Sequence, residues 1–383
     1  MAPGGLWTAL RGPPFAGTLP AVTESPHPLL PAATPVLRVD PTSLQVGGVD
    51  GRTGLRISPA GPDVAALLRR LDGRRSQSAV RGEAMADGLP AGLVDELLTG
   101  LRDTGLLHDL TAADLLATDP GPAATARAAV ELPAALAQPG AAGRWGTRRR
   151  STVVIDGATR VGTPLAAVLA ASGVGRVSVR DRGPTRAGDA IVGGATAADE
   201  GRPRSLAAAD AIRRAAPLTD LRPLPPDESA DLVVLCRPWA AADPLSAALQ
   251  KTGTPHLVAA VRQETGVVGP LVLPGATSCL RCAETWRRDD DPDWPRLATQ
   301  LAAADPVPSG GTITCLLTAL TAAVQVLAHL DGEEEPAVVD AALELRPPDF
   351  LPRLRRWPPH PGCGCCGAVR GGRGPERGQW GGE

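Results

Sequence analysis

The chain has 383 residues, a formal net charge of −2 and an aromatic content of only 2%, so its hydrophobic cores must be aliphatic. Both signs of charge are mixed along the sequence, which argues against a nucleic-acid-binding or membrane-surface protein. No uninterrupted apolar run reaches the ~18 residues that a membrane helix needs, and the N-terminus lacks the pattern of a signal peptide. We therefore expect a cytoplasmic protein, in which clustered cysteines are metal ligands rather than disulfides.

The N-terminal third predicts an arm followed by a small domain. Residues 1–30 are rich in Pro and Gly and lack periodicity, which predicts a disordered arm. Residues 31–112 contain three short strand candidates, then three helical stretches, then a closing strand candidate. The strand candidates are Val36–Val39, Leu44–Val46, Leu55–Ile57 and Leu106–His108. The helical stretches run from Asp63 to Leu71, from Gln77 to Ala86 and from Pro90 to about Leu101.

This order of elements is typical of a winged-helix domain, a class that often binds DNA. Its third helix, however, carries Asp95, Glu96 and Asp103 and offers few basic groups to phosphates. The domain is therefore expected to bind a peptide or a protein rather than nucleic acid.

Residues 113–147 are rich in Ala, Pro and Gly and are expected to form a linker with transient helix. The basic run Arg148–Arg150 at its end is expected to stay solvated. From there to residue 366, strands and helices alternate, which predicts an α/β, doubly wound Rossmann-like sheet with parallel strands. The expected strands are Thr152–Ile155, Val177–Val179, Leu232–Leu235, His256–Val261, Val267–Leu273 and Val338–Leu345. The expected helices are 163–171, 205–216, 244–251 and 312–330, with a charged loop at 287–308 and a disordered tail at 367–383.

A glycine loop follows the first strand of this second domain. The segment Val154-Ile-Asp-Gly-Ala-Thr-Arg-Val-Gly162 lies between a strand and a helix, the context that a dinucleotide-binding loop requires. Gly157 permits the tight turn, Gly162 allows close helix–strand packing, and Thr159 stands where the middle glycine approaches a phosphate. Asp181 ends the next strand, where an acid binds ribose hydroxyls. Two interpretations stay open: a nucleotide site, or glycines that only shape the turn.

Two Cys-x-x-Cys pairs lie far apart in the sequence: Cys279 with Cys282, and Cys363 with Cys366. Together they can supply the four thiolates of a tetrahedral structural zinc site. Cys365 competes with Cys366 for the fourth position, and His360 is a further candidate. A zinc ion here would attach the C-terminal segment to the sheet and contribute folding free energy.

With these features together, the chain resembles the ThiF/MoeB/HesA family, the ubiquitin-activating-enzyme-like adenylyltransferases, over about residues 150–367. The resemblance rests on Gly157-Ala-Thr-Arg-Val-Gly162, Gly173-Val-Gly-Arg-Val177, Asp181, Gly201-Arg-Pro-Arg204, Pro274-Gly-Ala-Thr-Ser-Cys279-Leu-Arg-Cys282 and His360-Pro-Gly-Cys363-Gly-Cys365-Cys366. It implies ATP at the carboxyl ends of the strands and zinc between the cysteine pairs. It also implies adenylation of the C-terminal carboxylate of a small carrier protein or peptide.

Position by position, the resemblance implies a damaged ATP site. Asp181 matches the ribose-binding acid, and Arg204 falls at the family's lysine, keeping its charge but not its shape. Asp189 and Val192 fall near the family's asparagine and arginine. Asp189 would bring negative charge to a phosphate, and Val192 offers no donor.

The position of the magnesium-binding acid is also changed. Arg237 and Pro238 stand there, after the strand that ends at Cys236, and the nearest acid is Asp243. These departures argue against efficient adenylation, since each loss could cost several kcal/mol of transition-state stabilisation.

The N-terminal domain resembles the leader-peptide-binding elements of ribosomal-peptide modification. We therefore expect a scaffold that binds a precursor peptide by strand addition at Val36–Val39 or Leu44–Val46 and docks a partner modification enzyme. Binding of ATP and Mg²⁺, and homodimer formation, stay open. The alternative is an active ATP-dependent adenylyltransferase acting on a small carrier protein or peptide. A nucleotide-binding oxidoreductase fits less well, because a second glycine motif is missing and the cysteine pairs would be unexplained.

Five further side chains are candidates for a role in function or in the core. Cys236 is expected to be a small buried residue, and His256 to be structural. Cys315 near the start of a long apolar helix is expected in the core, with a role as transfer cysteine left open. Trp286 and Trp294 either contact a partner or anchor the acidic loop.

Overall fold

The computed structural model describes residues 25–49, 54–118, 121–136, 143–225, 228–237, 244–303, 308–332 and 336–366, without the side chains of residues 302, 303 and 366. It divides into two compact units. The first contains residues up to Leu30 and Thr34–Ala112, and the second contains Pro31–Ala33 and the chain from Ala113 onward. Each unit has its own aliphatic core.

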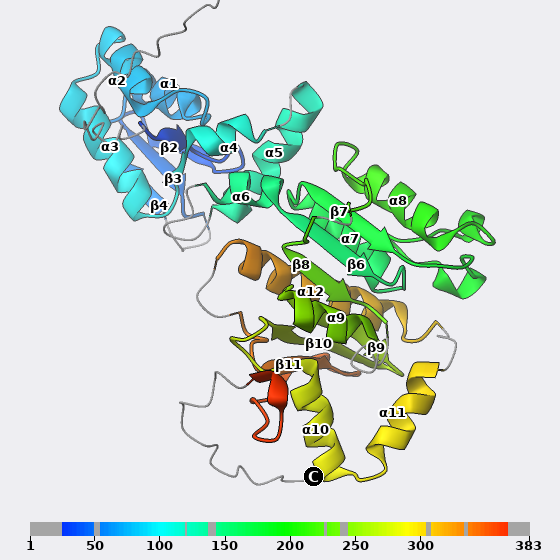
Figure 1. Ribbon diagram of the computed structural model, residues 1–383. Helices are drawn as coiled ribbons and strands as arrows, with labels where there is room; N and C mark the ends of the chain where they lie inside the picture. The colour runs from blue at the N-terminus through cyan, green and yellow to red at the C-terminus, as the bar shows by residue number, and fades with distance from the viewer. Residues whose placement is uncertain are drawn as a thin grey trace, which may run out of the picture. The chain divides into compact units, whose positions relative to one another are not determined.

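The first unit contains two small antiparallel sheets (Figure 1). Its strands are β1 (His27–Leu29), β2 (Val36–Asp40), β3 (Ser43–Gly47), β4 (Gly54–Ile57) and β5 (His108–Leu110). β3 pairs with β2 on one side and β4 on the other, and β1 pairs with β5. The expectation of a disordered arm through residue 30 is therefore wrong for its last residues, because β1 forms strand pairs and Leu29 and Leu30 are buried.

Three helices complete this unit: α1 (Pro62–Arg70), α2 (Gln77–Ala86) and α3 (Ala91–Asp103). Their apolar residues recur at helical spacing, so each helix buries one stripe against the others and against β3 and β4. The Ser76 hydroxyl accepts a hydrogen bond from the Ala79 N–H and caps α2.

The segment expected to be a linker forms helices α4 (Ala112–Leu116), α5 (Pro122–Ala135) and α6 (Arg144–Arg150). The Asp114 carboxylate accepts hydrogen bonds from the Gly143 and Gly146 N–H groups at the start of α6, and Trp145 is buried. These caps and buried apolar groups order a stretch whose composition alone suggested a linker.

The expectation of a solvated basic run at 148–150 is wrong for Arg148. Its guanidinium is buried and forms a bidentate pair with Asp331, with Nε 2.8 Å from Oδ1. Two parallel charge-assisted hydrogen bonds compensate the burial of both groups.

A seven-stranded mixed sheet forms the centre of the second unit, in the order β12-β11-β10-β9-β8-β6-β7. The strands are β6 (Thr152–Asp156), β7 (Arg176–Arg180), β8 (Leu232–Leu235), β9 (His256–Arg262), β10 (Thr265–Val272), β11 (Ala341–Leu345) and β12 (Arg353–Arg356). β7, β6, β8 and β9 are parallel, and the others are antiparallel to their neighbours. From β6 the chain continues to β7 on one side and later to β8 on the other, so the carboxyl end of β6 is a topological switch point.

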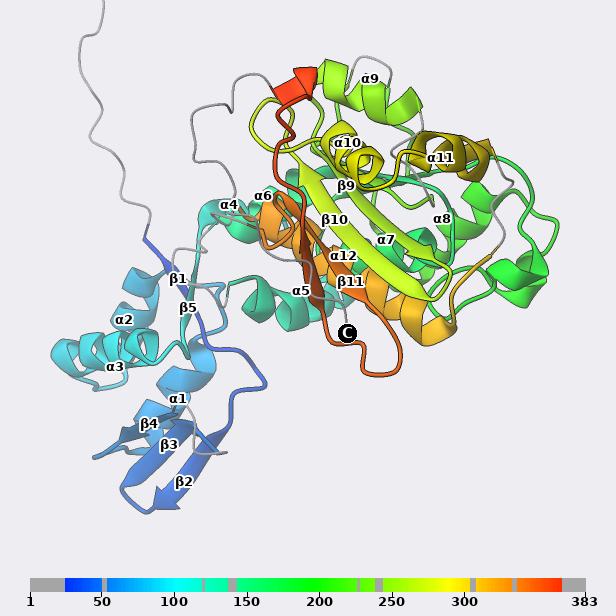
Figure 2. The ribbon, with the colours of Figure 1, turned by 90° about the horizontal axis from the view of Figure 1, so that it is seen from below.

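Helices cover both faces of this sheet. One face packs against α7 (Gly162–Ala171), α8 (Arg204–Ala215) and α12 (Thr312–Leu330), and the other against α9 (Pro244–Thr252) and α10 (Leu280–Asp290). Figure 2 shows α9, α10 and α11 (Trp294–Ala303) on one side of β9 and β10, with α12 on the other. α12 is long and apolar enough to cross a membrane, but half of its most apolar 18-residue window is buried in the fold, as in a core helix.

The charged segment 287–308 is not the loop that its composition suggested, because α10 and α11 include most of it. The Trp286 Nε1 donates to the Pro358 carbonyl at 2.9 Å, and the Trp294 indole N–H donates to the Glu284 carboxylate. Both tryptophans therefore anchor this segment to the fold.

Candidate functional site

The glycine loop lies at the switch point, between β6 and α7. Gly157 has a φ of +108°, and a Cβ there would lie 3.1 Å from the Arg237 Cγ. A Cβ on Gly162 would lie 2.0 Å from the Gly157 carbonyl oxygen. Both glycines are thus required by the turn itself, as the spacing of the loop predicted.

Thr159 changes what this loop presents to a ligand. Its hydroxyl oxygen accepts hydrogen bonds from the N–H groups of Val161 at 3.3 Å and Gly162 at 3.0 Å, at the start of α7. The same hydroxyl donates to the Cys236 carbonyl oxygen at 3.3 Å. N–H groups at a helix start are the donors that bind phosphate in such loops, and here they are occupied by a side chain of the loop.

Asp181, which follows β7, is also engaged by the protein itself. Its carboxylate accepts hydrogen bonds from the Ala158 N–H at 2.7 Å and the Arg182 N–H at 2.7 Å. The Arg237 Nη2 donates to it at 3.0 Å, and the Asp181 side chain is only 2% exposed. In this conformation the carboxylate that is predicted to bind ribose is covered.

Arg237 follows β8 and extends across the loop. Its Nε donates to the Asp156 carboxylate at 3.2 Å, while its Nη2 reaches Asp181. One guanidinium thus links the carboxyl ends of β6 and β7 from the end of β8. The arginine stands where the sequence comparison expected a magnesium-binding acid, and Asp243 lies outside the described residues.

Arg204 begins α8 and lies close to two carboxylates. Its Nη2 is 2.9 Å from the Asp189 Oδ2, and its Nη1 is 3.9 Å from the Asp181 Oδ2. Asp189 is buried, whereas Val192 is exposed. The structure therefore brings together Gly157, Thr159, Gly162, Asp181 and Arg204, and adds Arg237, which the sequence suggested only as a missing acid.

The cysteines form a second centre on the opposite face of the sheet. Cys279, just before α10, and Cys363 near the C-terminus lie 84 residues apart in sequence, yet their sulfur atoms are 3.6 Å apart. The Cys279 and Cys282 sulfurs are 3.8 Å apart. The ligand atoms of Cys279, Cys363 and Cys365 all lie within 4.8 Å of one another.

These distances fit a metal site. Four sulfur ligands at ~2.3 Å from a tetrahedral zinc ion are ~3.8 Å from one another, whereas a disulfide requires ~2.05 Å. The cysteines of this group are free thiols. Burial raises the pKa of the Cys363 thiol, so metal binding would have to displace a proton there.

Of the predicted ligands, Cys282 has its sulfur near that of Cys279 but is not one of this group of three. Cys365 lies within the group, while the side chain of Cys366 lies outside the described part of the chain, so that prediction stays open. His360 is used elsewhere: its Nδ1 accepts from the Gly362 N–H at 3.0 Å and its Nε2 is 2.9 Å from the Asp289 carboxylate. With both ring nitrogens engaged, His360 orients the segment rather than binding a metal.

The remaining candidates are structural. Burial raises the pKa of the Cys236 and Cys315 thiols, which keeps both protonated at neutral pH. Cys315 donates to the Ser309 carbonyl at 3.4 Å. The charge of Arg160 lowers its pKa, but burial is the larger effect and raises it, so the thiol is a poor nucleophile. His256 is buried, and burial lowers its pKa.

Comparison with known proteins decides the family. A model of the ThiF family matches residues 141–365, more than half of the chain. The chain belongs to the ThiF family. The ThiF-family match spans α6 through Cys365, so it includes the glycine loop and Cys279, Cys282, Cys363 and Cys365.

Solved structures agree in fold with this ThiF-family chain. E. coli MccB bound to ATP has a TM-score of 0.57 at 15% identity, and covers 89% of this chain and 99% of its own. The Microcin C7 biosynthetic enzyme MccB in complex with N-formylated MccA has a TM-score of 0.57 at 14% identity, with the same coverage. PaaA has a TM-score of 0.52 at 17% identity, covering 85% of this chain and 98% of its own. No curated protein matched.

These comparisons confirm the predicted fold class, a ThiF-like α/β sheet preceded by a small α+β unit. At such low identity, the solved structures establish the fold alone.

Proposed function

We propose that this ThiF-family chain is a peptide-binding scaffold of a peptide-modification pathway, with a nucleotide site occupied by its own side chains. It would bind a precursor peptide and present it to a partner modification enzyme in the cytoplasm. The observation that carries the proposal is the closure of the ATP position by Arg237 and Thr159. MccB, which has the same fold, is described in complex with the peptide MccA, and that likeness supports a peptide as the partner.

Hydrogen bonds within the protein already occupy the groups that would bind ATP, and this argues against ATP binding. The donors at the start of α7 are satisfied by Thr159, and the Asp181 carboxylate is satisfied by two backbone N–H groups and Arg237. A nucleotide would have to break these interactions before making its own. Each charge-assisted hydrogen bond lost costs about 1.5–3 kcal/mol.

Peptide binding is assigned to the outer edge of β2. Only two strands of the described three-stranded sheet lie at an edge, and the candidate Leu44–Val46 is wrong as an edge because β3 lies between β2 and β4. Val36, Leu37 and Val39 of β2 are exposed apolar residues. An extended peptide adding to this edge would gain backbone hydrogen bonds and cover these side chains.

The cysteine centre is proposed to hold a structural zinc ion through Cys279, Cys282, Cys363 and either Cys365 or Cys366. Zinc fits the all-sulfur donor set and the sulfur separations. Bound there, it would hold the C-terminal segment against α10 and contribute to stability rather than to chemistry.

The alternative is an active adenylyltransferase. The Arg237 side chain is 32% exposed, so a nucleotide could displace it, and Arg204 would then remain to face a phosphate. In that case a peptide carboxylate would attack the α-phosphorus of ATP and release pyrophosphate.

ATP–pyrophosphate exchange and nucleotide calorimetry distinguish the two functions. The peptide to use is one encoded beside the gene for this protein. We expect peptide binding without exchange and without measurable ATP binding. Peptide-dependent exchange would establish the alternative.

The docking edge is tested by Leu37→Lys, which places a charge on β2 at an exposed position. Because lysine on an edge strand opposes pairing, we expect peptide affinity to fall about tenfold with an unchanged melting temperature. Leu354→Lys, at an exposed residue of β12 in the second unit, is the matched control and should leave peptide affinity unchanged. Equal loss in both variants would contradict docking at β2.

A further inference from the structure

A cavity of about 320 Å³ lies on the face of the sheet that carries α10, away from the nucleotide loop. Its floor is apolar and includes Val258 of β9, Val267 of β10 and Ala342 of β11. None of its described lining residues belongs to the glycine loop or to the cysteine centre. The cavity is at the small end of the range of ligand pockets, which begins at ~300 Å³.

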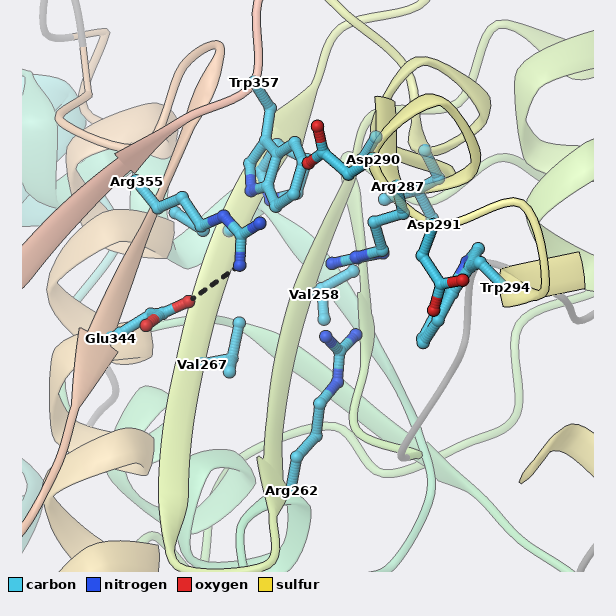
Figure 3. Close-up of a pocket in the computed structure, with 15 residues that line it drawn as sticks. Val258, Arg262, Val267, Arg287, Asp290, Asp291, Trp294, Glu344, Arg355 and Trp357 are labelled. Carbon is cyan, nitrogen blue, oxygen red and sulfur yellow. Dashed lines mark ion pairs between the residues drawn. The ribbon is translucent and has the colours of Figure 1, made fainter. Parts of the chain in front are cut away.

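Three arginines from different elements converge on this cavity. Arg262 ends β9, Arg287 lies in α10 and Arg355 lies in β12. Figure 3 shows their guanidinium groups pointing toward one another into the same space. Their acidic partners lie to the side: Arg287 pairs with Glu284, and Arg355 is 3.7 Å from the Glu344 carboxylate.

Without a bound ligand, the three arginine charges repel one another, which raises the free energy of this arrangement. Burial is the main cause that lowers the pKa of Arg262 to about 10; the charges of Arg287 and Arg355 act in the same direction, and those of Glu284 and Glu344 oppose them. All three groups still carry their charges at neutral pH, so they repel one another in a partly desolvated space. An anion placed among them would relieve this repulsion.

Aromatic rings hold two of these arginines in position. The Arg287 guanidinium carbon lies 4.7 Å from the centroid of the Trp357 ring and 5.5 Å from that of Trp294. The Arg355 guanidinium carbon lies 4.3 Å from the Trp357 centroid. Stacked guanidinium groups lose less freedom when they bind a ligand, which favours a planar anion that accepts two parallel hydrogen bonds.

The charge around the cavity selects a monoanion. Its lining also includes Glu344, Asp290 and Asp291, of which the two aspartates are exposed at the end of α10. These three acids equal the three arginines in number, but the two aspartates are exposed and water screens their charges. The arginines are therefore only partly offset, and a single negative charge is better matched than the dianion of phosphate. A carboxylate is planar, carries one charge and fits the bidentate geometry of arginine.

We propose that this cavity is a second binding site of the protein, for one carboxylate group inserted among Arg262, Arg287 and Arg355. The carboxylate comes from either an acidic side chain or a chain terminus of a peptide-sized ligand. The proposal does not depend on whether the glycine loop binds a nucleotide, so it applies both to a scaffold and to an active enzyme.

Calorimetry on the full chain with small probes tests the site and its source. N-acetyl-glutamate α-amide carries only a side-chain carboxylate, and N-acetyl-alanine carries only a terminal one. N-acetyl-alaninamide is the neutral control, and inorganic phosphate tests the charge. We expect at least one of the two carboxylate probes to bind more tightly than the amide and the phosphate. The probe that binds more tightly shows whether the natural carboxylate is a side chain or a chain terminus.

Variants then locate the binding. Arg262→Gln and Arg355→Gln should each weaken the carboxylate about tenfold or more, since each removes a charged donor. Arg356→Gln changes the exposed next residue of the same strand and should leave binding unchanged. If Arg262→Gln does not fold, Arg355→Lys, which keeps the charge but loses the fork, should still weaken binding measurably.

Three results would overturn the proposal. They are no carboxylate binding by the wild-type chain, equal or tighter binding of the amide or of phosphate, and equal loss of affinity in the Arg356 variant. The melting temperature of each variant separates a lost ligand contact from a lost fold.

Discussion

At the residue scale, Arg237 has the largest consequence for function. It is bonded to the acids that end two neighbouring strands, and its backbone and Cγ lie against Gly157. Comparison with the family shows only that an acid is missing at this position. The structure shows that the arginine in its place extends across the glycine loop. Under the proposed function, nucleotide binding depends on the free energy needed to displace the Arg237 side chain.

Replacing Arg237 by Ala should therefore increase nucleotide affinity. The change removes the donor that competes for Asp181, so we expect calorimetry to detect ATP binding by the variant, whereas the wild-type chain shows none. Arg222→Ala is the control, because Arg222 makes a comparable pair with Asp220 at the surface. ATP affinity that stays the same in the Arg237 variant would mean that the arginine does not close the site.

Gly162 provides a second residue-level prediction, about stability. A methyl group there would approach the Gly157 carbonyl oxygen to 2.0 Å, so the turn between β6 and α7 must shift. We expect Gly162→Ala to destabilise the protein by about 2 kcal/mol or more in denaturant unfolding. Gly82→Ala, where a Cβ meets nothing within 4 Å in helix α2, should leave stability unchanged or slightly raised.

At the element scale, the cysteine centre connects the start of α10 to the C-terminal segment. These two segments are distant in sequence. The C-terminal one contains only a single helical turn, η4 (Gly364–Cys366). Around it, His360 binds Asp289 and stacks edge-on against Trp286 at 4.4 Å between ring centroids. The thiols and this small polar cluster together attach the segment to α10.

Loss of the metal should therefore loosen this segment. We expect purified protein to contain about one zinc ion per chain, and Cys279→Ser to lose it and about 2 kcal/mol or more of stability. Cys315→Ala, at a buried cysteine outside the group, should retain the metal. Metal-free wild-type protein with an unchanged melting temperature would refute the site.

At the scale of the whole molecule, two separate aliphatic cores predict two unfolding events. One core belongs to the helices and small sheets of the first unit, and the other to the seven-stranded sheet. We expect calorimetry to show two transitions, with a chelator lowering only that of the second unit, because the cysteine centre lies there. A single transition that shifts as a whole would show that the units unfold as one.

The sequence by itself determined the fold class, the glycine turn and the two cysteine pairs. Alternation of strands and helices, glycines at a strand-to-helix turn and Cys-x-x-Cys spacing are local patterns, so they can be read without knowing which distant residues meet. The helices at 122–135 and 294–303 were missed because their composition resembles linker or loop and tertiary packing stabilises them. Leu44–Val46 was likewise correct as a strand but wrong as an edge, since strand order is not a local property.

Only the tertiary structure decided which side chains lie together at the glycine loop and around the cavity. Arg237 is 56 residues from Asp181 in sequence. Arg262, Arg287 and Arg355 belong to three different elements, and no local sequence pattern predicts that they line one cavity. The physical reason is the same in each case. Side chains far apart in sequence interact through charge and burial only after the sheet has fixed the directions in which they point.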